Sequence, residues 1–229
     1  MDKLVDYLCI IQARLSSSRL PAKVMLDLDG KIVLERVYES LLNSQRIDTI
    51  VVATSTEVSD NIIENKLKSL NIKYYRGNLN NVLKRFYDTA IEYNPKNIIR
   101  ITADNPLMDG KIIDDLIKIY ENNNAEYSMF SNAIYGLSAE VFSFKALEKA
   151  YSNARNEFDK EHVTPYIKDN AKCYIEDIEK KYKVPNLSIT IDTLADYITM
   201  NEFYIFCATN KYITNIDTFL KYQLIQKEI

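Results

Sequence analysis

Three positively charged side chains follow an apolar run that ends near Gln12. They are Arg14, Arg19 and Lys23, in the segment Arg-Leu-Ser-Ser-Ser-Arg-Leu-Pro-Ala-Lys. Guanidinium groups bind phosphate oxygens in pairs, and a lysine ammonium adds a compact charge. If the apolar run is a strand of an α/β sheet, these cations lie at its carboxyl end, where such sheets bind ligands. The segment therefore predicts a polyphosphate site, with a solvated surface loop as the alternative. It is not a P-loop, because the glycine spacing of that motif is absent.

Two aspartates stand in a similar position further along the chain. Asp104 follows the apolar segment 97–103, and Asp192 follows the segment 186–191. Magnesium beside a nucleotide takes one or two carboxylates together with phosphate oxygens. Each aspartate also has a structural alternative, an Asx turn or helix cap at Asp104 and a helix N-cap at Asp192. If the two carboxylates converge, they form a magnesium site beside the polyphosphate.

Histidine and cysteine carry less information. His162 is the only histidine, and a lone histidine is more often a structural hydrogen-bonding residue than a catalyst. Cys9, Cys173 and Cys207 are an odd number at wide spacing, which fits reduced thiols and no metal motif. Neither residue type by itself indicates a metal centre or a general base.

The composition limits the class of protein. The chain has 229 residues, 47% of them hydrophobic, which suits one domain with a substantial core. Its formal net charge of -3 gives no broad basic field for nucleic acid. The first apolar run is too short for a signal peptide, and no later run has membrane-spanning length. We expect a cytoplasmic protein with neither nucleic acid nor membrane as a partner.

The elements that position these residues alternate over the first half of the chain. Buried-type apolar runs predict strands at 6–13, 47–54, 72–76 and 97–103. Apolar side chains at helical spacing predict helices at 33–45, 58–71, 80–94 and 111–123. This alternation predicts a parallel sheet with helices on both faces. The three cations that follow Gln12 are therefore expected at the same carboxyl edge of the sheet as Asp104.

The second half is less regular. Asp29-Gly30 predicts the turn of a hairpin over residues 26–33. Further strands are expected at 136–144 and 186–191, and helices at 144–154, 159–170 and 197–210. Pro165 stands near the start of the second helix or at a break in it. The expected fold class is α/β, with a small antiparallel insertion or edge.

The segment 10–37, IIQARLSSSRLPAKVMLDLDGKIVLERV, resembles the opening signature of the cytidylyltransferases that make CMP-sialic acid and CMP-KDO. The match is closest to their spore-coat-polysaccharide (SpsF-type) branch. The similarity continues through IVVATST, YYRGNLNNVLKRFYDTA, RITADNPLMD, GLSAEVFSFKALEKAY, EFDKEHVTPYI and ITIDTLADY, in the family's order. It covers nearly the whole chain.

The resemblance implies a single Rossmann-like (GT-A-like) nucleotidyltransferase domain over residues 1–229, with a mostly parallel central sheet and a small antiparallel insertion. It implies transfer of CMP from CTP to a sugar acid or a phosphorylated acceptor, release of pyrophosphate, and Mg²⁺ as the cofactor. A role in surface glycan biosynthesis and a homodimer are further implications. The acceptor and dimer subregion is expected at about 133–190.

The resemblance also implies roles for single residues. The catalytic residues would be Arg14, Lys23, Asp104 and Asp192, with Asp104 and Asp192 as the metal ligands. The nucleotide would contact Gln12, Ala13, Arg14, Ser18, Arg19, Lys23, Thr54, Arg76 and Ala103. The acceptor would contact Arg100, Glu140, Arg155, Glu161, His162 and Tyr166. Arg100 and Arg155 are the cations that a phosphorylated acceptor would need.

Several positions depart from the branch's pattern. Ala22 replaces a glycine, so the turn before Lys23 must accept a β-carbon. Ser55, Asn80, Asn81 and Ser138 stand where acidic residues are usual, which leaves acceptor identity open and base choice dependent on the resemblance. A GT-A glycosyltransferase is one alternative, although no Asp-x-Asp motif follows the strand 97–103. A non-catalytic nucleotide-binding protein is the other.

Overall fold

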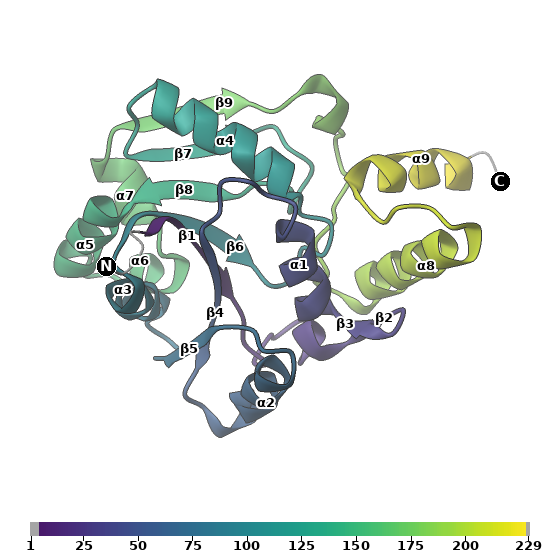
Figure 1. Cartoon of the computed structure of the whole chain (residues 1–229), viewed down its shortest axis with the longest axis horizontal. Helices are drawn as coiled ribbons and strands as arrows, with labels where there is room; N and C mark the ends of the chain where they lie inside the picture. Colours follow the sequence, from purple (N-terminus) through teal and green to yellow (C-terminus); the bar gives the residue numbers. More distant parts are fainter. Residues whose placement is uncertain (1–4, 228–229) are drawn as a thin grey trace.

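The computed structural model describes residues 5–227, and the ends of the expected domain, 1–4 and 228–229, lie outside the described residues. A seven-stranded sheet has the order β5-β4-β1-β6-β8-β7-β9 (Figure 1). Only β8 runs antiparallel to its two neighbours, and the other pairings are parallel. The strands are β1 (Val5–Gln12), β4 (Thr49–Ser55), β5 (Tyr74–Gly77), β6 (Pro95–Thr102), β7 (Tyr127–Ser131), β8 (Glu140–Ser143) and β9 (Cys173–Asp177). The expected α/β fold with a mostly parallel sheet is confirmed.

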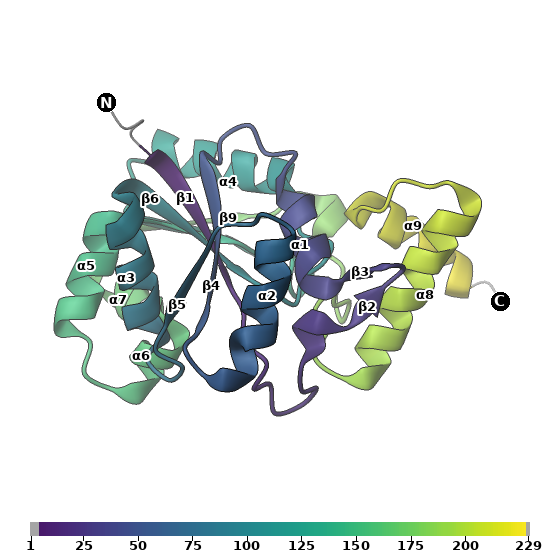
Figure 2. The same ribbon diagram turned by 60° about the horizontal axis from the view of Figure 1, so that its bottom comes forward.

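Helices cover both faces of this sheet (Figure 2). One face carries α1 (Val33–Leu41), α2 (Asn61–Ser69) and α4 (Gly110–Asn122). The helices α8 (Leu194–Asn210) and α9 (Ile216–Lys227) continue the same hydrophobic core to one side of the sheet, beyond α1 (Figure 1). The other carries α3 (Val82–Tyr93), α5 (Phe144–Asn153), α6 (Glu157–His162) and α7 (Pro165–Asn170). Short 3-10 helices are η1 (Lys23–Met25), η2 (Val58–Asp60) and η3 (Lys180–Tyr182).

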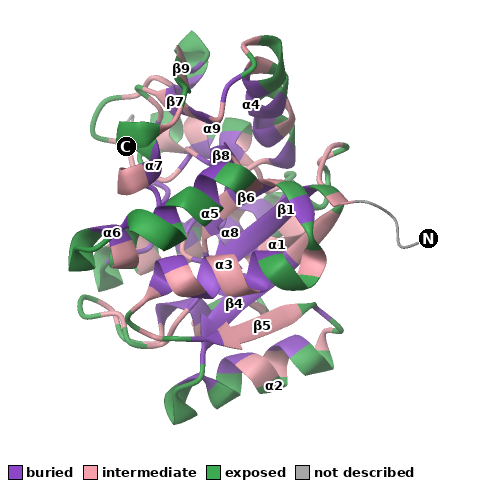
Figure 3. Cartoon of the chain, turned by 90° about the vertical axis from the view of Figure 1, so that its left-hand side faces the viewer, coloured by how far each residue is buried: buried purple, intermediate pink, exposed green. Residues whose placement is uncertain are grey.

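The central strand explains why two cores form. Along β1, Cys9 and Ile11 enter the core beneath α1 and α4, while Leu8 and Ile10 enter the core beneath α3 and α5. Side chains of a strand alternate between faces, so an apolar run without polar interruptions buries both of them. Figure 3 shows β1 and β4 buried between partly exposed helices.

The predicted hairpin is present as β2 (Asp27–Leu28) and β3 (Lys31–Ile32). Asp29 and Gly30 both have positive φ, 51° and 82°, as a two-residue turn of type I′ requires. The Asp27 carbonyl accepts a hydrogen bond from the Tyr197 hydroxyl, which fixes the hairpin against α8 (Figure 1).

One predicted element was wrong. Residues 186–191 form no strand: their contact with the loop after β7 is a single bridge, between Ser188 and Tyr135. The segment predicted as helical over 159–170 breaks at Pro165, as the position of this proline allowed: Val163 has φ of 70°, and Pro165 begins α7. The elements β7, β9 and α9 were not predicted.

Within residues 5–227, every helix is too short or too polar to cross a lipid bilayer.

Candidate active site

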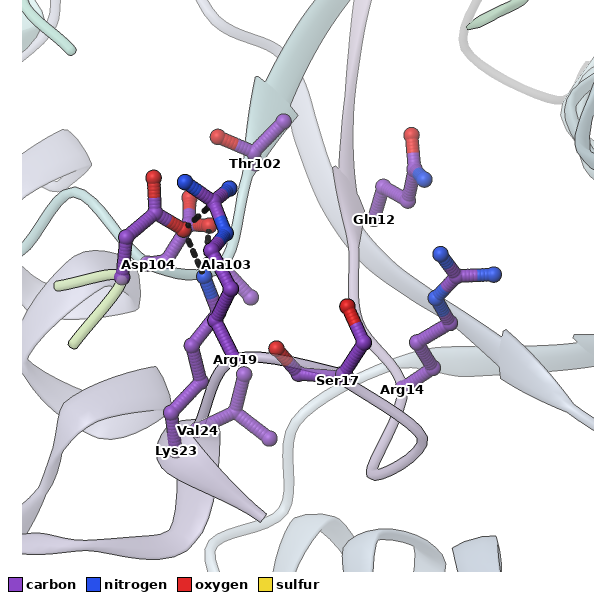
Figure 4. A pocket seen from close by; sticks show the side chains of 11 residues that line it. Gln12, Arg14, Ser17, Arg19, Lys23, Val24, Thr102, Ala103 and Asp104 are labelled. Carbon is purple, nitrogen blue, oxygen red and sulfur yellow. Dashed lines mark hydrogen bonds and ion pairs between the residues drawn. The ribbon is translucent and has the colours of Figure 1, made fainter. Parts of the chain in front are cut away.

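A lysine from the first loop lies between the two predicted aspartates. The Nζ atom of Lys23 is 2.5 Å from Oδ2 of Asp104 and 2.8 Å from Oδ1 of Asp192. Arg19 adds a second cation, with Nη2 2.9 Å from the same Asp192 oxygen. The Lys23 side chain is buried, so these charges meet in a setting where water screens them weakly. Figure 4 shows Arg19, Lys23 and Asp104 pointing toward one another.

Backbone hydrogen bonds explain why residues so far apart in sequence meet here. The Ala103 N–H donates to the Gln12 carbonyl at 3.0 Å, which aligns the ends of β1 and β6. The Ile191 N–H donates to the Asp104 carbonyl at 2.9 Å, which holds the segment before α8 against the end of β6. The three segments that carry Lys23, Asp104 and Asp192 therefore share the carboxyl edge of the sheet.

The loop after β1 is folded back on itself by specific contacts. The Leu15 N–H donates to Oδ1 of Asp60 at 3.0 Å, and the Ala22 N–H donates to the Leu15 carbonyl at 2.9 Å. Ala22 has φ of 57°, a left-handed conformation that disfavours a β-carbon. Ala22, which stands where related sequences have glycine, is therefore in a strained backbone conformation directly before Lys23.

A cavity of about 210 Å³ opens beside this cluster, and we call it the Lys23 cavity. It is lined by Gln12, Arg14, Ser17, Ser18, Arg19, Lys23, Val24, Thr102, Ala103, Asp104 and Asp192. All four residues predicted as catalytic line it. Of the residues predicted to contact the nucleotide, Ala13, Thr54 and Arg76 do not.

Those three residues have structural partners instead. Ala13 is buried, and its N–H donates to the Ala53 carbonyl. Thr54 is fully buried and donates to Oδ2 of Asp60 at 3.1 Å. The Arg76 guanidinium donates to the Ser55 and Glu57 carbonyls and also pairs with Glu64, which joins β5 to the start of α2. These contacts are structural, and none of the three residues lines the cavity.

Arg14 lies on the opposite side of the Lys23 cavity from the acidic pair (Figure 4). Its Nη2 atom is 3.5 Å from Oε1 of Glu161, where the Arg14 side chain is partly exposed and the Glu161 side chain is exposed. Such a long, exposed ion pair is weak. Arg14 is therefore free to exchange Glu161 for a stronger anion in the cavity.

A second cavity, of about 470 Å³, meets the first at Arg19, Thr102, Asp104 and Asp192. We call it the Asn105 cavity. Its remaining lining residues are Arg100, Asn105, Met129, Phe130, Ser131, Asn132, Ala133, Ile134, Tyr135, Gly136, Ser138 and Thr190. Hydroxyl, amide and apolar groups dominate this lining, whereas charged groups dominate the Lys23 cavity.

Arg100 is the one residue of the predicted acceptor set that lines the Asn105 cavity. It forms an ion pair with Glu140, and its Nη2 donates to the Gln12 side chain at 3.3 Å. Its Nε is buried without a hydrogen-bond partner among residues 5–227. That unused donor is closed to solvent, so it is not offered to a ligand in the cavity.

Glu140 is buried in a polar cluster below the cavity instead of lining it. Its Oε1 accepts hydrogen bonds from Tyr127 at 2.7 Å and Thr164 at 2.8 Å, and it pairs with Lys168 at 2.8 Å. Burial alone would raise the pKa of Glu140, but Arg100 and Lys168 outweigh it and lower the pKa to about 2. The carboxylate thus holds Arg100 in place as a permanent anion.

The other predicted acceptor residues lie away from the Asn105 cavity. Arg155, Glu161 and His162 are exposed around α6, and the His162 ring packs against Phe158 at a centroid distance of 4.4 Å. Tyr166 packs in part against the core beneath α3 and α5. Of this group, Glu161 contacts Arg14 of the Lys23 cavity, and none lines the Asn105 cavity.

Two polar residues that line the Asn105 cavity, Asn105 and Thr190, were not predicted as site residues from the sequence. Oδ1 of Asn105 accepts a hydrogen bond from the Thr190 hydroxyl at 2.6 Å, and its Nδ2 donates to Oγ1 of Thr102 at 2.7 Å. Asn105 follows Asp104 and Thr190 precedes Asp192 by two residues, so their position beside the predicted acids was an available signal. Asp60, which orders the first loop, carried no comparable signal.

The acidic pair fits a magnesium ion that is shared with phosphate. Among residues 5–227, no cluster of three or more acidic, histidine or cysteine side chains could hold a metal alone. Oδ1 of Asp104 is buried without a hydrogen-bond partner within those residues, and the Lys23 ammonium already stands where a cation would bridge Asp104 and Asp192. Two carboxylates with room for phosphate oxygens are the donor set that Mg²⁺ prefers.

Comparison with known proteins places this site in a sequence family. The family model described as cytidylyltransferase matches residues 8–228. The uncharacterized protein MJ1063 of Methanocaldococcus jannaschii is 41% identical over 191 residues, which cover 82% of this chain and 79% of that protein. The spore coat polysaccharide biosynthesis protein SpsF of Bacillus subtilis is 32% identical over 207 residues, 87% of this chain and 86% of its own.

A solved structure agrees with these sequence matches. The structure of a cytidylyltransferase from Leptospira borgpetersenii superposes on this chain with a TM-score of 0.85 at 29% identity. The superposition covers 98% of this chain and 95% of that one. The similarity therefore extends over nearly the whole chain.

Proposed function

Because the chain belongs to the cytidylyltransferase family, we propose that it transfers CMP from CTP to a sugar acid or a phosphorylated small-molecule acceptor, releasing pyrophosphate. The similarity to SpsF, named for spore coat polysaccharide biosynthesis, supports a role in making a surface glycan. At the level of residues, one observation carries the proposal: Lys23, Asp104 and Asp192 meet between two cavities.

The Lys23 cavity would hold the triphosphate. Arg14 from one wall and Arg19 with Lys23 from the other would neutralise the β- and γ-phosphates as negative charge develops on the leaving pyrophosphate. To do this, the Lys23 ammonium must leave the two carboxylates on which it rests. Arg14 would likewise release Glu161, at small cost because that pair is long and exposed.

Asp104 and Asp192 would hold Mg²⁺, which when bound supplies charge stabilisation at the α-phosphate. The chain's own contribution is to keep these two carboxylates at one point through the Ile191-to-Asp104 backbone hydrogen bond. The capping box of Thr193 and Asp196 fixes the start of α8 immediately after Asp192. Both contacts limit the motion of the metal ligands and so reduce the reorganisation needed at reaction.

The acceptor would occupy the Asn105 cavity, on the other side of the acidic pair. Its oxygen attacks the α-phosphorus in line, the new P–O bond forms, and the bond to the β-phosphate oxygen breaks. A hydroxyl acceptor releases its proton to solvent, whereas a phosphate acceptor is already ionised. The hydroxyls and amides of the lining support a polyhydroxylated acceptor, and Arg100 supports one acidic group on it.

Pyrophosphate measurement tests the proposal. The protein is incubated with Mg²⁺, one of the four nucleoside triphosphates, and 3-deoxy-manno-octulosonate, N-acetylneuraminate or a sugar phosphate. We expect pyrophosphate from CTP together with an equal amount of a CMP conjugate. Release of a nucleoside diphosphate from a nucleotide-sugar would favour a glycosyltransferase, and the absence of any turnover would favour a nucleotide-binding protein.

The family resemblance also extends the proposal to a homodimer. The contact would involve the segment from about 133 to 190. Sedimentation velocity across a range of protein concentrations tests this part independently of activity, because a monomer at all concentrations would reject it.

A further inference from the structure

The Asn105 cavity continues outward into another cavity. This one, of about 580 Å³, is lined by Asn132, Ala133, Tyr135, Lys183, Val184, Pro185, Asn186, Leu187 and Ser188, and we call it the Pro185 cavity. The two cavities share Asn132, Ala133 and Tyr135. Tyr135 therefore stands at the junction of a cleft that begins at Asp104 and Asp192.

The backbone at this junction is held on both sides. The Tyr135 N–H donates to the Leu187 carbonyl at 3.1 Å, and the Tyr135 carbonyl accepts from Ile189 at 2.9 Å. The next residue, Gly136, has φ of 94°, and a β-carbon there would lie 2.3 Å from Oγ1 of Thr190. The glycine is thus required for the close approach of this loop to the wall of the Asn105 cavity.

The Tyr135 side chain is exposed although its backbone is fixed. The Tyr135 residue is 64% exposed, while its neighbours Ile134 and Leu137 are buried and anchor the loop. Within residues 5–227, no hydrogen bond, ion pair or ring contact engages the Tyr135 side chain. A rigid backbone that presents an unpartnered aromatic ring to a cleft is arranged for contact with a ligand.

The surrounding groups indicate what the ligand is made of. Val184, Pro185 and Leu187 form an apolar floor, and the polar groups between them are amides and a hydroxyl. The one cation of the lining, Lys183, is paired with Asp177, which also accepts from the Asn132 side chain. A ligand with an apolar face and a neutral hydroxylated edge matches this lining, as a saccharide ring does.

From these observations we propose that the acceptor extends past the reaction centre, with the neutral, hydroxylated part of its sugar stacked on Tyr135 and directed into the Pro185 cavity. This inference rests on the proposed function for the identity of the acceptor. It assigns Tyr135 as a specificity-determining residue that touches the acceptor and not the nucleotide. Arg100 and the acidic pair would hold the reacting end, and Tyr135 the distal end.

Saturation-transfer NMR on 3-deoxy-manno-octulosonate and N-acetylneuraminate tests it, with Mg²⁺ and a non-hydrolysable CTP analogue present. We expect transfer to the sugar protons in the wild type, loss of most of it in Tyr135→Ala, and retention in Tyr135→Phe, which keeps the ring. Tyr212→Ala removes another exposed tyrosine, far along the chain beyond α8, and is the matched control. For any acceptor that turns over, Tyr135→Ala raises the acceptor KM about tenfold and leaves the CTP KM unchanged.

The outcomes separate the two proposals. Sugar signals that are unaffected by Tyr135→Ala, or absent for both sugars in the wild type, overturn the Tyr135 assignment even if CTP yields pyrophosphate. Sugar signals that depend on Tyr135, without pyrophosphate from any nucleotide, support the saccharide site and reject the proposed transfer.

Discussion

The Lys23 cavity and the Asn105 cavity share a wall but are built from different chemistry. In the first, cations from one loop meet two carboxylates, and the distances between charged atoms are 2.5–2.9 Å. In the second, three loop segments contribute hydroxyls, amides and apolar side chains, and the charge of Arg100 is already compensated by Glu140. A triphosphate with its metal needs fixed charge, whereas a hydroxylated acceptor needs neutral donors and shape.

This difference indicates which cavity would determine the specificity for the acceptor. Under the proposed function, the charged cavity would serve any acceptor, because it would contact the nucleotide tail. Under the same proposal, the neutral cavity, lined by residues between 129 and 138 and by Thr190, would be the part that can be altered without loss of the transfer chemistry. Changes in the two cavities should therefore have separable effects on kcat, on the acceptor KM and on stability.

The largest effect is expected from Asp104→Asn. The variant keeps the side-chain shape but removes one charge that faces Lys23, so CMP transfer should fall about 10²–10³-fold. Asp115→Asn, at an exposed position of α4, is the matched control and should retain activity. Steady-state pyrophosphate release checks this, with thermal unfolding to confirm the fold. A rate within threefold of the wild type would remove Asp104 from the site.

Lys23→Met is expected to separate metal binding from turnover. With the ammonium gone, Asp104 and Asp192 lose the cation they share, so Mn²⁺ should bind without nucleotide about tenfold more tightly. Turnover should still fall about 100-fold, because the triphosphate loses a positive contact. Electron paramagnetic resonance of free Mn²⁺ measures the first effect. Unchanged or weaker Mn²⁺ binding would show that Lys23 does not compete for the metal position.

Glu140→Gln should lower the stability of the protein, because Glu140 belongs to the buried polar cluster beneath the Asn105 cavity. The folded pKa of about 2 lies below the ordinary value of 4.5, so the carboxylate stabilises fully above about pH 4.5 and progressively less as the pH falls toward 2. At pH 7 the variant should be less stable by roughly 3 kcal/mol. Urea unfolding at pH 7 and pH 3 checks this, with exposed Glu157→Gln as the control. If the difference in the free energy of unfolding between wild type and Glu140→Gln is as large at pH 3 as at pH 7, the stabilising role of the Glu140 carboxylate is contradicted.

The smallest effect is expected from Ala22→Gly in the loop of the Lys23 cavity. Relief of the left-handed strain outweighs the added freedom of the unfolded chain, so Tm should rise about 2 °C. Ala171→Gly, where φ is -106°, should lower Tm instead. Differential scanning calorimetry compares the two variants. A similar decrease in both would mean that the turn tolerates alanine without strain.

The sequence predicted the parallel sheet and the segments of the Lys23 cavity well, because both depend on local signals. The apolar run before Gln12 marks a strand, and charged residues directly after a strand must lie at its carboxyl edge. The family resemblance supplied the pairing of Asp104 with Asp192, whose convergence depends on one long-range backbone contact. Their roles in catalysis stay predictions.

The acceptor side was predicted poorly for a physical reason. The segment 186–191 has strand-like composition, yet it pairs with a loop through a single bridge at Tyr135. Glu140 looked available to a ligand, but three strands and α7 bury it with Tyr127 and Lys168. Such placements depend on packing between distant segments, which residue types and spacing do not encode.

A crystal structure with Mn²⁺ and a non-hydrolysable CTP analogue tests the central claim most directly, with anomalous scattering to locate the metal. We expect one anomalous peak within coordination distance of both Asp104 and Asp192, and the Lys23 ammonium moved onto a phosphate oxygen. A nucleotide bound elsewhere, or bound while Lys23 still bridges the two carboxylates with no metal beside them, would contradict the account.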